Sequence, residues 1–330
     1  MPHLAYLASL SEQDHLSGYR EGLEYIRFGE RVTPDTKIFI KPNLTFPEYR
    51  PGVMTSPEAV AAALQAISDY TPHIWIGDSD SGGYNRFSMD LVYASTGLRE
   101  VCARHGAKIV NLSSLPRRPI HFRYKRRKFA LDLPVLLTDE MDFTVTMPVP
   151  KVHCNTGVSL SFKNQWGCIP ENRDRLRLHP YFQHVILEVN RAIRAGPVLM
   201  DGRYGLNGNG PMKGIPVELG WILVAGDLGS AARLACELMQ IELDRIPHLR
   251  YLESRAPIPA RAAITINRDP APFLRERFYL RRKVTDLPGL LAFRNPWIAH
   301  LAYFSPLSGF LHKLLYLVRE PFYDYGEKRK

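Results

Sequence analysis

The stretch KIFIKPNL at residues 37–44 decides the fold class. Its first half, Lys37–Ile40, is a short apolar run typical of a fully buried strand, and it ends directly in the polar residue Lys41. A helix with Ser56 as its N-cap is expected over Pro57–Tyr70. A buried strand, a polar turn and a helix in this order form the repeating unit of a parallel sheet covered by helices.

The same order of elements repeats on both sides of this stretch. We expect strands at Leu4–Leu10, His73–Ile76, Lys108–Leu112, Phe143–Met147, Val198–Met200, Trp221–Ala225 and Ala262–Ile266, and further helices at Gly18–Phe28, Leu98–His105 and Ala231–Met239. Several of these strands run into Lys, Asp or Gly at their carboxyl ends. The sequence therefore predicts an α/β fold with a mostly parallel sheet, flanking helices, and a polar site along the edge where the strands end.

Length and composition indicate a globular chain with a distinct C-terminal part. The 330 residues are 45% hydrophobic and 23% charged, which is typical of a folded protein. We expect an α/β core domain at 1–270 that carries the polar site, and a basic linker followed by an apolar, aromatic-rich helical tail at 271–330. The segment Pro296–Val318 is long enough to span a membrane, but Pro306 and its polar residues argue against a span. A helix that packs back on the body, a helix lying on a membrane surface and a partner-binding or lid helix are the alternatives.

A formal net charge of +10 indicates anionic partners. Basic residues gather at 117–128 and 275–283, where a solvated strand edge or loop is the simplest interpretation. No helix-turn-helix pattern, RNA-binding aromatic motif or zinc finger accompanies them, so nucleic acid is not expected. Because the first residues lack the pattern of a secretory signal, we expect a cytoplasmic protein, with a peripheral membrane location as the alternative.

The cysteines indicate reduced thiols. Cys102, Cys154, Cys168 and Cys236 are scattered without a close pair. This spacing argues against a disulfide framework and against a self-contained zinc or iron–sulfur site, so no intrinsic iron–sulfur cluster is expected.

The densest polar stretch, at 151–168, supplies the candidate catalytic residues. We expect it to form a loop that follows a strand and enters a short helix, presenting ammonium groups and backbone amides to an anion. Lys151, His153 and Lys163 are the candidates, because a partly dehydrated lysine or a histidine can titrate near neutral pH and move a proton.

Polar side chains elsewhere are expected to bind the same small anionic metabolite. The candidate substrate-binding residues are Lys41, Asn43, Asn155, Ser159, Asn164, Asn207 and Asn209. The segment 201–211 is rich in Gly and Asn and is expected to form a tight loop. Asp78 and Asp201 follow strands, and a divalent metal such as Mg²⁺ held between them and a substrate phosphate is a further expectation. Asp227 is expected to cap a helix.

Taken together, these segments resemble the DUF362 family, a domain of unknown function. The resemblance rests on an ordered set of motifs over residues 36–240, namely Lys41–Leu44, Ser56–Pro57, Gly77–Asp78, Pro150–His153, Ser159–Gly167, Asp201–Pro211 and Gly226–Asp227. It implies an α/β fold and a polar site of Lys, Asn and Asp, but no reaction. Many relatives of this type carry a ferredoxin-like segment with clustered cysteines. This chain has no cysteine after Cys236, so an electron-transfer role would need a separate ferredoxin.

Three alternatives for the function follow. The leading one is an enzyme that binds a small carboxylated or phosphorylated metabolite, in which Lys151 and Lys163 neutralise the anion or move a proton. Isomerisation, elimination and group transfer are all open to such a site. The second is an iron–sulfur-associated redox protein that works with a separate ferredoxin. The third is a membrane-associated binding or scaffold protein that acts through the C-terminal tail.

Overall fold

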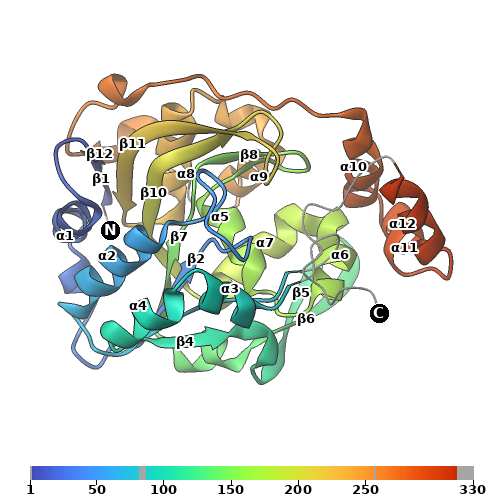
Figure 1. Ribbon diagram of the computed structural model, residues 1–330, viewed down its shortest axis with the longest axis horizontal. Coiled ribbons are helices and arrows are strands. Elements are labelled where there is room, and N and C mark those ends of the chain that lie inside the picture. Colours follow the sequence, from blue (N-terminus) through green and yellow to red (C-terminus); the bar gives the residue numbers. More distant parts are fainter. Residues whose placement is uncertain (1, 82–86, 256–257, 318–330) are drawn as a thin grey trace.

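A mixed sheet runs through the middle of the protein (Figure 1). The computed structural model describes residues 2–81, 87–255 and 258–317. Strand order is β12-β1-β11-β10-β7-β2-β3-β4, with β8 beside β10 and β9 beside β8. The bounds are β1 His3–Ser9, β2 Ile38–Pro42, β3 Ile74–Asp78, β4 Lys108–Asn111, β7 Phe143–Met147, β8 Lys151–His153, β9 Gly157–Ser159, β10 Ala195–Asn207, β11 Ile215–Ala225 and β12 Ile264–Ile266.

Most neighbouring strands of this sheet are parallel. The antiparallel pairs are β11 with β1, β11 with β10, and β9 with β8. Strand β1 lies between β11 and β12, pairing antiparallel with the first and parallel with the second. The expected α/β class with a mostly parallel sheet is confirmed.

Helices cover both faces of the sheet (Figure 1). Their bounds are α1 His15–Tyr25, α2 Pro57–Ser68, α3 Met89–Ser95, α4 Leu98–Arg104, α5 Ser161–Asn164, α6 Asn172–Leu178, α7 Phe182–Ala192, α8 Leu228–Leu238 and α9 Pro247–Glu253. Helices α1 to α4 share a core with Ile38 and Ile40 of β2, whereas α5, α7, α8 and α9 share the other core with Phe39. Successive side chains of β2 thus enter opposite cores, as a central strand requires.

Two helix caps expected from the sequence are present. Ser56 accepts a hydrogen bond from the backbone N–H of Ala59 at the start of α2, and Pro57 occupies the first position of that helix. Asp227 accepts one from the backbone N–H of Ser230 and caps α8.

The expected tight loop at 201–211 is wrong over most of its length. Strand β10 continues through Asn207 and pairs with β11 in a long hairpin. The glycines serve packing here, because a Cβ atom on Gly202 would lie 2.1 Å from the Trp221 ring. Gly202 leaves room for the Trp221 indole against the backbone, and the chain remains an extended strand there.

The expected loop at the start of 151–168 is a β-hairpin. Strand β8 pairs with β9, and Val152 and Val158 face each other with both side chains buried. Only Ser161–Asn164 is helical, followed by a 3₁₀ turn at Gln165–Cys168. The two valines explain why β8 and β9 pair, because this register buries both apolar side chains and leaves the polar residues between them in the turn.

The basic run at 117–128 lies on a separate two-stranded sheet. It consists of β5 (Arg117–Tyr124) and β6 (Arg127–Pro134). Phe122 and Leu131 turn inward while the basic side chains face solvent, which confirms the expected solvated strand edge.

The C-terminal part forms three short helices beside the body (Figure 1). They are α10 (Leu287–Arg294), α11 (Pro296–Tyr303) and α12 (Ser308–Tyr316), and Pro306 lies between the last two. Phe293 packs on His179 and Phe182, with ring centroids 5.0 and 5.6 Å away. Within residues 2–81, 87–255 and 258–317, no helix combines the length and apolarity needed to cross a bilayer. The expected tail residues after Leu317 lie outside the described residues.

Candidate functional site

A cavity of about 350 Å³ lies at the carboxyl ends of β2 and β3 and is closed by segments from much later in the chain. Its lining includes these residues singled out from the sequence: Lys41, Asn43, Asp78, Lys151, His153, Asn155, Ser159, Lys163, Asn164 and Asn209. The volume is in the range of small-molecule sites. Lys41 and Lys163, which are far apart in sequence, thus line one cavity.

Two of the candidate residues do not line this cavity. The Asn207 side chain donates to Glu276 and accepts from the backbone of Tyr279, which fastens the linker to β10. Asp201 accepts hydrogen bonds from the backbone N–H of Ser56 and contacts His15 at 3.3 Å. The structure therefore gives Asp201 partners on α1 and α2, away from Asp78.

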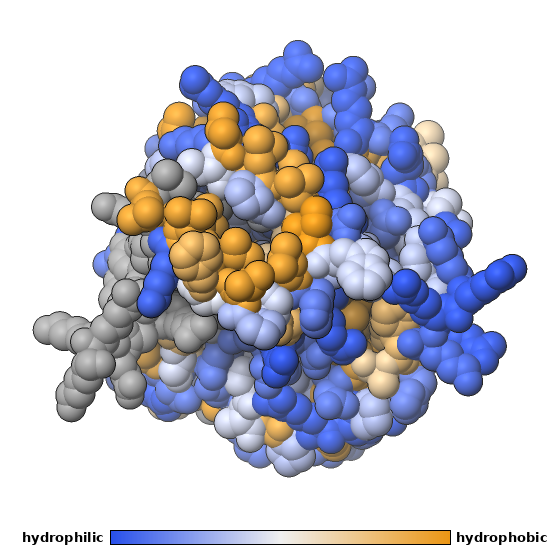
Figure 2. Space-filling view, turned by 90° about the vertical axis from the view of Figure 1, so that its right-hand side faces the viewer, coloured by the Kyte–Doolittle hydropathy of each residue, from blue (hydrophilic) through white to orange (hydrophobic). Residues whose placement is uncertain are grey.

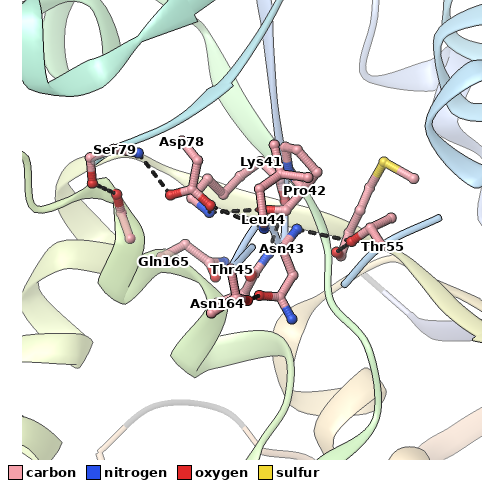
Figure 3. Close-up of polar contacts among 12 residues, drawn as sticks. Lys41, Pro42, Asn43, Leu44, Thr45, Thr55, Asp78, Ser79, Asn164 and Gln165 are labelled. Carbon is pink, nitrogen blue, oxygen red and sulfur yellow. Dashed lines mark hydrogen bonds and ion pairs between the residues drawn. The ribbon is translucent and has the colours of Figure 1, made fainter. Parts of the chain in front are cut away.

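A buried ion pair forms the floor of the cavity (Figure 3). Lys41 Nζ lies 2.6 Å from Asp78 Oδ2 and also donates to the Pro42 carbonyl. The Asp78 carboxylate accepts from the backbone N–H groups of Leu44 and Ser79 as well. Burial raises the pKa of the Asp78 carboxyl, and the Lys41 ammonium acts in the opposite direction. The charge of Lys41 is therefore matched within the protein.

The turn after α5 closes tightly over this ion pair. A Cβ atom on Gly167 would lie 2.4 Å from Asp78 Oδ1 and 3.0 Å from Lys41 Nζ, so only glycine fits. Asn164 donates to the Lys41 carbonyl and to Thr146 Oγ1, both at 2.8 Å, which ties α5 to β2 and β7. These contacts fix α5, and with it Lys163, against the ends of the strands.

Lys151 is buried beside the loop that follows β2. Its Nζ donates to the Val53 carbonyl at 2.7 Å, and Asn43 donates to the same carbonyl. Burial, and then the charges of Lys163 and Lys41, hold the pKa of Lys151 well below its usual value. Lys151 therefore releases a proton more readily than an exposed lysine.

Lys163 faces the cavity without an anionic partner. Among the described residues none accepts a hydrogen bond from its ammonium group, which lies 5.9 Å from the centroid of the Phe182 ring. Burial lowers its pKa to about 8. At neutral pH this side chain is therefore mostly a cation without a counter-ion among the described residues, and it titrates close to physiological pH.

The His153 ring is held in one tautomer. The backbone N–H of Asn155 donates to His153 Nδ1 at 3.2 Å, so in the neutral ring the proton sits on Nε2. Burial, and then the charges of Lys163 and Lys151, keep the pKa of His153 well below its usual value. A neutral His153 thus offers a hydrogen-bond donor, and a charged form is disfavoured.

Asn155, Ser159 and Asn209 complete the predicted set around the hairpin. The Asn155 side chain accepts from Cys154, and Ser159 pairs with Lys151 through the backbone. Asn209 donates to the Asp286 carboxylate at 2.8 Å, so it fastens the start of the tail to the rim of the cavity.

The lining also contains residues that sequence reasoning missed, among them Arg175 and His179. Arg175 donates to the Asp80 carbonyl, its buried Nε has no partner among the described residues, and burial lowers its pKa to about 10. His179 stacks on Trp166, and burial together with the charge of Lys163 lowers its pKa to about 3. Both lie in a charged helical segment, at 172–181, that looks like a solvated surface in sequence.

The described residues contain no group of three or more His, Cys, Asp or Glu side chains placed to hold a metal ion. Burial raises the pKa of the Cys168 and Cys236 thiols to about 12, which is opposite to what a thiolate ligand needs.

The arrangement favours binding of an anion followed by proton transfer. Lys163 presents a positive charge that no described residue pairs, and Arg175, whose charge interacts favourably with Asp78 and Asp80, lines the same cavity. Both side chains are partly buried, and partial removal from water strengthens an ionic contact. A lysine with a pKa of about 8 beside a neutral histidine can accept and return a proton near neutral pH.

Several known proteins are similar to this chain. The model of a family described as a domain of unknown function, DUF362, matches residues 38–237. A thylakoid-associated protein of Synechocystis sp. is 25% identical over 317 residues, which cover 91% of this chain and 90% of that protein.

Two solved structures align with part of this chain. The lactate racemase apoprotein of Thermoanaerobacterium thermosaccharolyticum aligns with a TM-score of 0.46 and 14% identity, over 72% of this chain and 56% of that one. A Thermotoga maritima protein aligns with a TM-score of 0.42 and 13% identity, over 68% and 59%. The chain spans little more than half the length of either.

Proposed function

This chain belongs to the DUF362 family, whose description assigns no function, so we propose one from the site itself. The protein is an enzyme that binds a small carboxylated or phosphorylated metabolite in the cavity. It catalyses a reaction that includes a proton transfer, with Lys163 as the group that exchanges the proton and the neutral His153 as a hydrogen-bond donor to the substrate.

The observation that carries the proposal is the unmatched positive charge of Lys163. Lys41 already has Asp78 as its partner, whereas Lys163 has none among the described residues. Holding a partly buried ammonium without a counter-ion costs stability, so such a group is retained where a ligand supplies the charge. Arg175 also lines the cavity and adds a second positive charge near the same anion.

Carboxylate and phosphate are the ligand classes that fit these groups. Both accept several charge-assisted hydrogen bonds at once, and a cavity of about 350 Å³ limits the ligand to a small metabolite. Isomerisation and elimination can proceed with one group that takes a proton from the substrate and returns it to another atom, which neutral Lys163 can do, while the Nε2–H of His153 donates a hydrogen bond. Lys151 is the next candidate for the base.

The relative from Synechocystis is described as thylakoid-associated. We propose a membrane surface as the location of this chain too, with the enzyme bound peripherally.

A thermal-unfolding series with inorganic phosphate and with malate tests the binding step. We expect each fitting anion, at about a hundred times its Kd, to stabilise the protein by about 2.7 kcal/mol. Lys163→Met should weaken this binding by about tenfold to a hundredfold, because a charge-assisted contact is lost. Lys128→Met removes the same charge from the exposed hairpin and should leave binding unchanged. A folded protein that no carboxylate or phosphate stabilises would contradict the proposal.

The binding should also depend on pH. Lys163 loses its proton as the pH rises through about 8, so anion binding should weaken between pH 7 and pH 9. The proton transfer is tested by incubation of small carboxylates and phosphate esters with the enzyme in D₂O. Deuterium incorporation that is absent with Lys163→Met and His153→Gln supports the assigned roles, and incorporation that survives both changes contradicts them.

A further inference from the structure

The three C-terminal helices turn a row of large apolar side chains towards solvent. Figure 2 faces this side of the molecule and shows the apolar side chains gathered in one patch. We call this row the tail stripe; its members are between 45% and 82% exposed and are Leu287, Leu291, Trp297, Leu301, Leu307, Phe310, Leu314 and Leu317. Soluble proteins rarely leave so many large apolar side chains together in water without a binding role.

The spacing of the stripe residues places their side chains along one face of each helix. Leu287 and Leu291 are four residues apart, and so are Trp297 and Leu301. From Leu307 to Leu317 the steps are three, four and three residues, which places the side chains on one side of α12. The buried residues Ala292 and Ala299 lie on the other sides of α10 and α11. These two helices therefore pack on the body through those sides and leave the stripe exposed.

The charged side chains within α10 to α12 have one sign. From Leu287 to Leu317 the sequence contains no Asp or Glu, while Arg294 and Lys313 are exposed among the apolar residues. The residues just before α10 add Arg281, Arg282 and Lys283, which are exposed as well. An apolar face whose own helices carry only cations is complementary to a bilayer that contains anionic lipids, because apolar groups enter the acyl boundary and the cations meet the headgroups.

The length of the helices determines how such a contact is made. Each has eight or nine residues, or about 12 to 14 Å, against the roughly 30 Å of a hydrocarbon core. They cannot span it, but they can lie in its surface. The exposed aromatic side chains Trp297 and Phe310 suit the interfacial layer of the bilayer, where aromatic rings are preferred.

We propose that the tail stripe docks in the plane of a lipid bilayer that carries anionic headgroups. Gly289 of α10 and Tyr303 of α11 also line the cavity, so docking brings one cavity wall to the headgroup layer. That last consequence rests on the proposed enzymatic function, and docking itself gives the surface for the proposed peripheral membrane location.

Flotation of the full chain with phosphatidylcholine vesicles, with and without phosphatidylglycerol, tests the proposal. We expect flotation with the anionic vesicles, weakened between about 0.1 M and about 1 M salt as charges are screened. The double substitution Phe310→Ser with Leu314→Ser should lower partitioning at least tenfold. Leu91→Ser, on α3 away from the tail, exchanges a 41% exposed leucine and should have no effect.

Fluorescence provides a second readout. Trp297 is 82% exposed, whereas Trp166 and Trp221 are buried and Trp75 is partly buried in β3, under Lys108. A blue shift on vesicle addition should therefore come from Trp297 and vanish in Trp297→Phe. Stabilisation by phosphate should persist in the Phe310→Ser, Leu314→Ser protein, which separates failure of docking from failure of the proposed function.

Three results would overturn the proposal. The first is equal flotation of the native and doubly substituted proteins, or none of either. The second is a dimer in light scattering that the double substitution dissociates, with no vesicle binding, since the stripe would then join two copies. The third is vesicle binding only after removal of residues 318–330, since the stripe would then be covered by the chain's own end.

Discussion

Lys163 is subject to two opposing demands. The proposed anionic ligand requires it to be charged, whereas its buried position favours the neutral amine and lowers its pKa to about 8. In this proposal the side chain stabilises the complex and destabilises the free protein. Such opposition between binding and stability is common where a site is built before its ligand arrives.

Replacing Lys163 by Met should stabilise the ligand-free protein at pH 7. Between about pH 8 and pH 10.5 the unfolded chain binds more protons at this residue than the folded one, so native stability rises with pH there and the penalty is complete below pH 8. We expect a gain of about 1 to 3 kcal/mol at pH 7 that shrinks towards zero at pH 10. Urea unfolding at both pH values measures it, with Lys128→Met as the control. A loss of stability at pH 7 would reveal a favourable contact of Lys163 in the free protein.

Replacing Asp78 by Asn should be far more harmful. It leaves the 1% exposed Lys41 charged and unpaired in the protein, a change that typically costs about 3 to 5 kcal/mol. Asp139→Asn breaks the exposed pair with Arg118 and should cost less than about 1 kcal/mol. Urea unfolding compares the two. Equal costs would show that Lys41 finds water or another acceptor.

At the level of elements, Asp201 of β10 links this strand to two helices. Its carboxylate holds the N-terminal end of α2 through the Ser56 amide and the start of α1 through His15. Burial raises the pKa of this carboxyl, but hydrogen bonds from His15 and Ser56 outweigh that effect and lower it overall. The residue therefore stabilises two helix positions in its ionised form.

Asp201→Asn should destabilise the protein at neutral pH by about 1 to 3 kcal/mol. Since the native pKa is lowered, the contribution of the carboxylate is present above pH 3.8 and is lost as the pH falls through the native pKa. Native and substituted proteins should thus become more alike in acid. Guanidinium unfolding at pH 7 and near pH 3 measures this, and a stabilisation by Mg²⁺ that only the native protein shows would instead support the metal expectation.

The sequence anticipates elements whose signal is local. The Ser56 cap, the buried run before Lys41 and the strand ends at Lys41 and Asp78 follow from patterns within a few residues. Asp201–Pro211 was misjudged because a glycine that admits an indole ring and a glycine that turns the chain are identical in sequence. Arg175 and His179 were missed because only tertiary packing carries their segment to the cavity.

At the level of the whole molecule, the cavity depends on both parts of the chain. The core supplies the strand ends and the hairpin, and the tail supplies Asp286, Gly289 and Tyr303. The expected boundary at residue 270 therefore marks a change in composition, but residues on both sides of it line one cavity.

Two truncations test this dependence. A chain that ends at Asp286 lacks α10 and α11, so we expect it to stay folded and to bind phosphate about tenfold more weakly, because the cavity opens to water. A chain that ends at Leu307 keeps both helices and should bind as the full chain does. Calorimetric titration measures both affinities. Full affinity in the shorter chain would show that the tail contributes nothing to the site.

The position of β1 has a consequence for synthesis of the protein on the ribosome. This apolar strand is made before the other strands of the sheet, yet its neighbours are β11 and β12, at 215–225 and 264–266. Its hydrogen-bonding edges therefore stay unpaired in the nascent chain until almost the whole core has been made, a state in which strands are prone to aggregate. Pairing of β1 is a late event, and a nascent chain that stalls before β12 emerges exposes an edge that the finished protein covers.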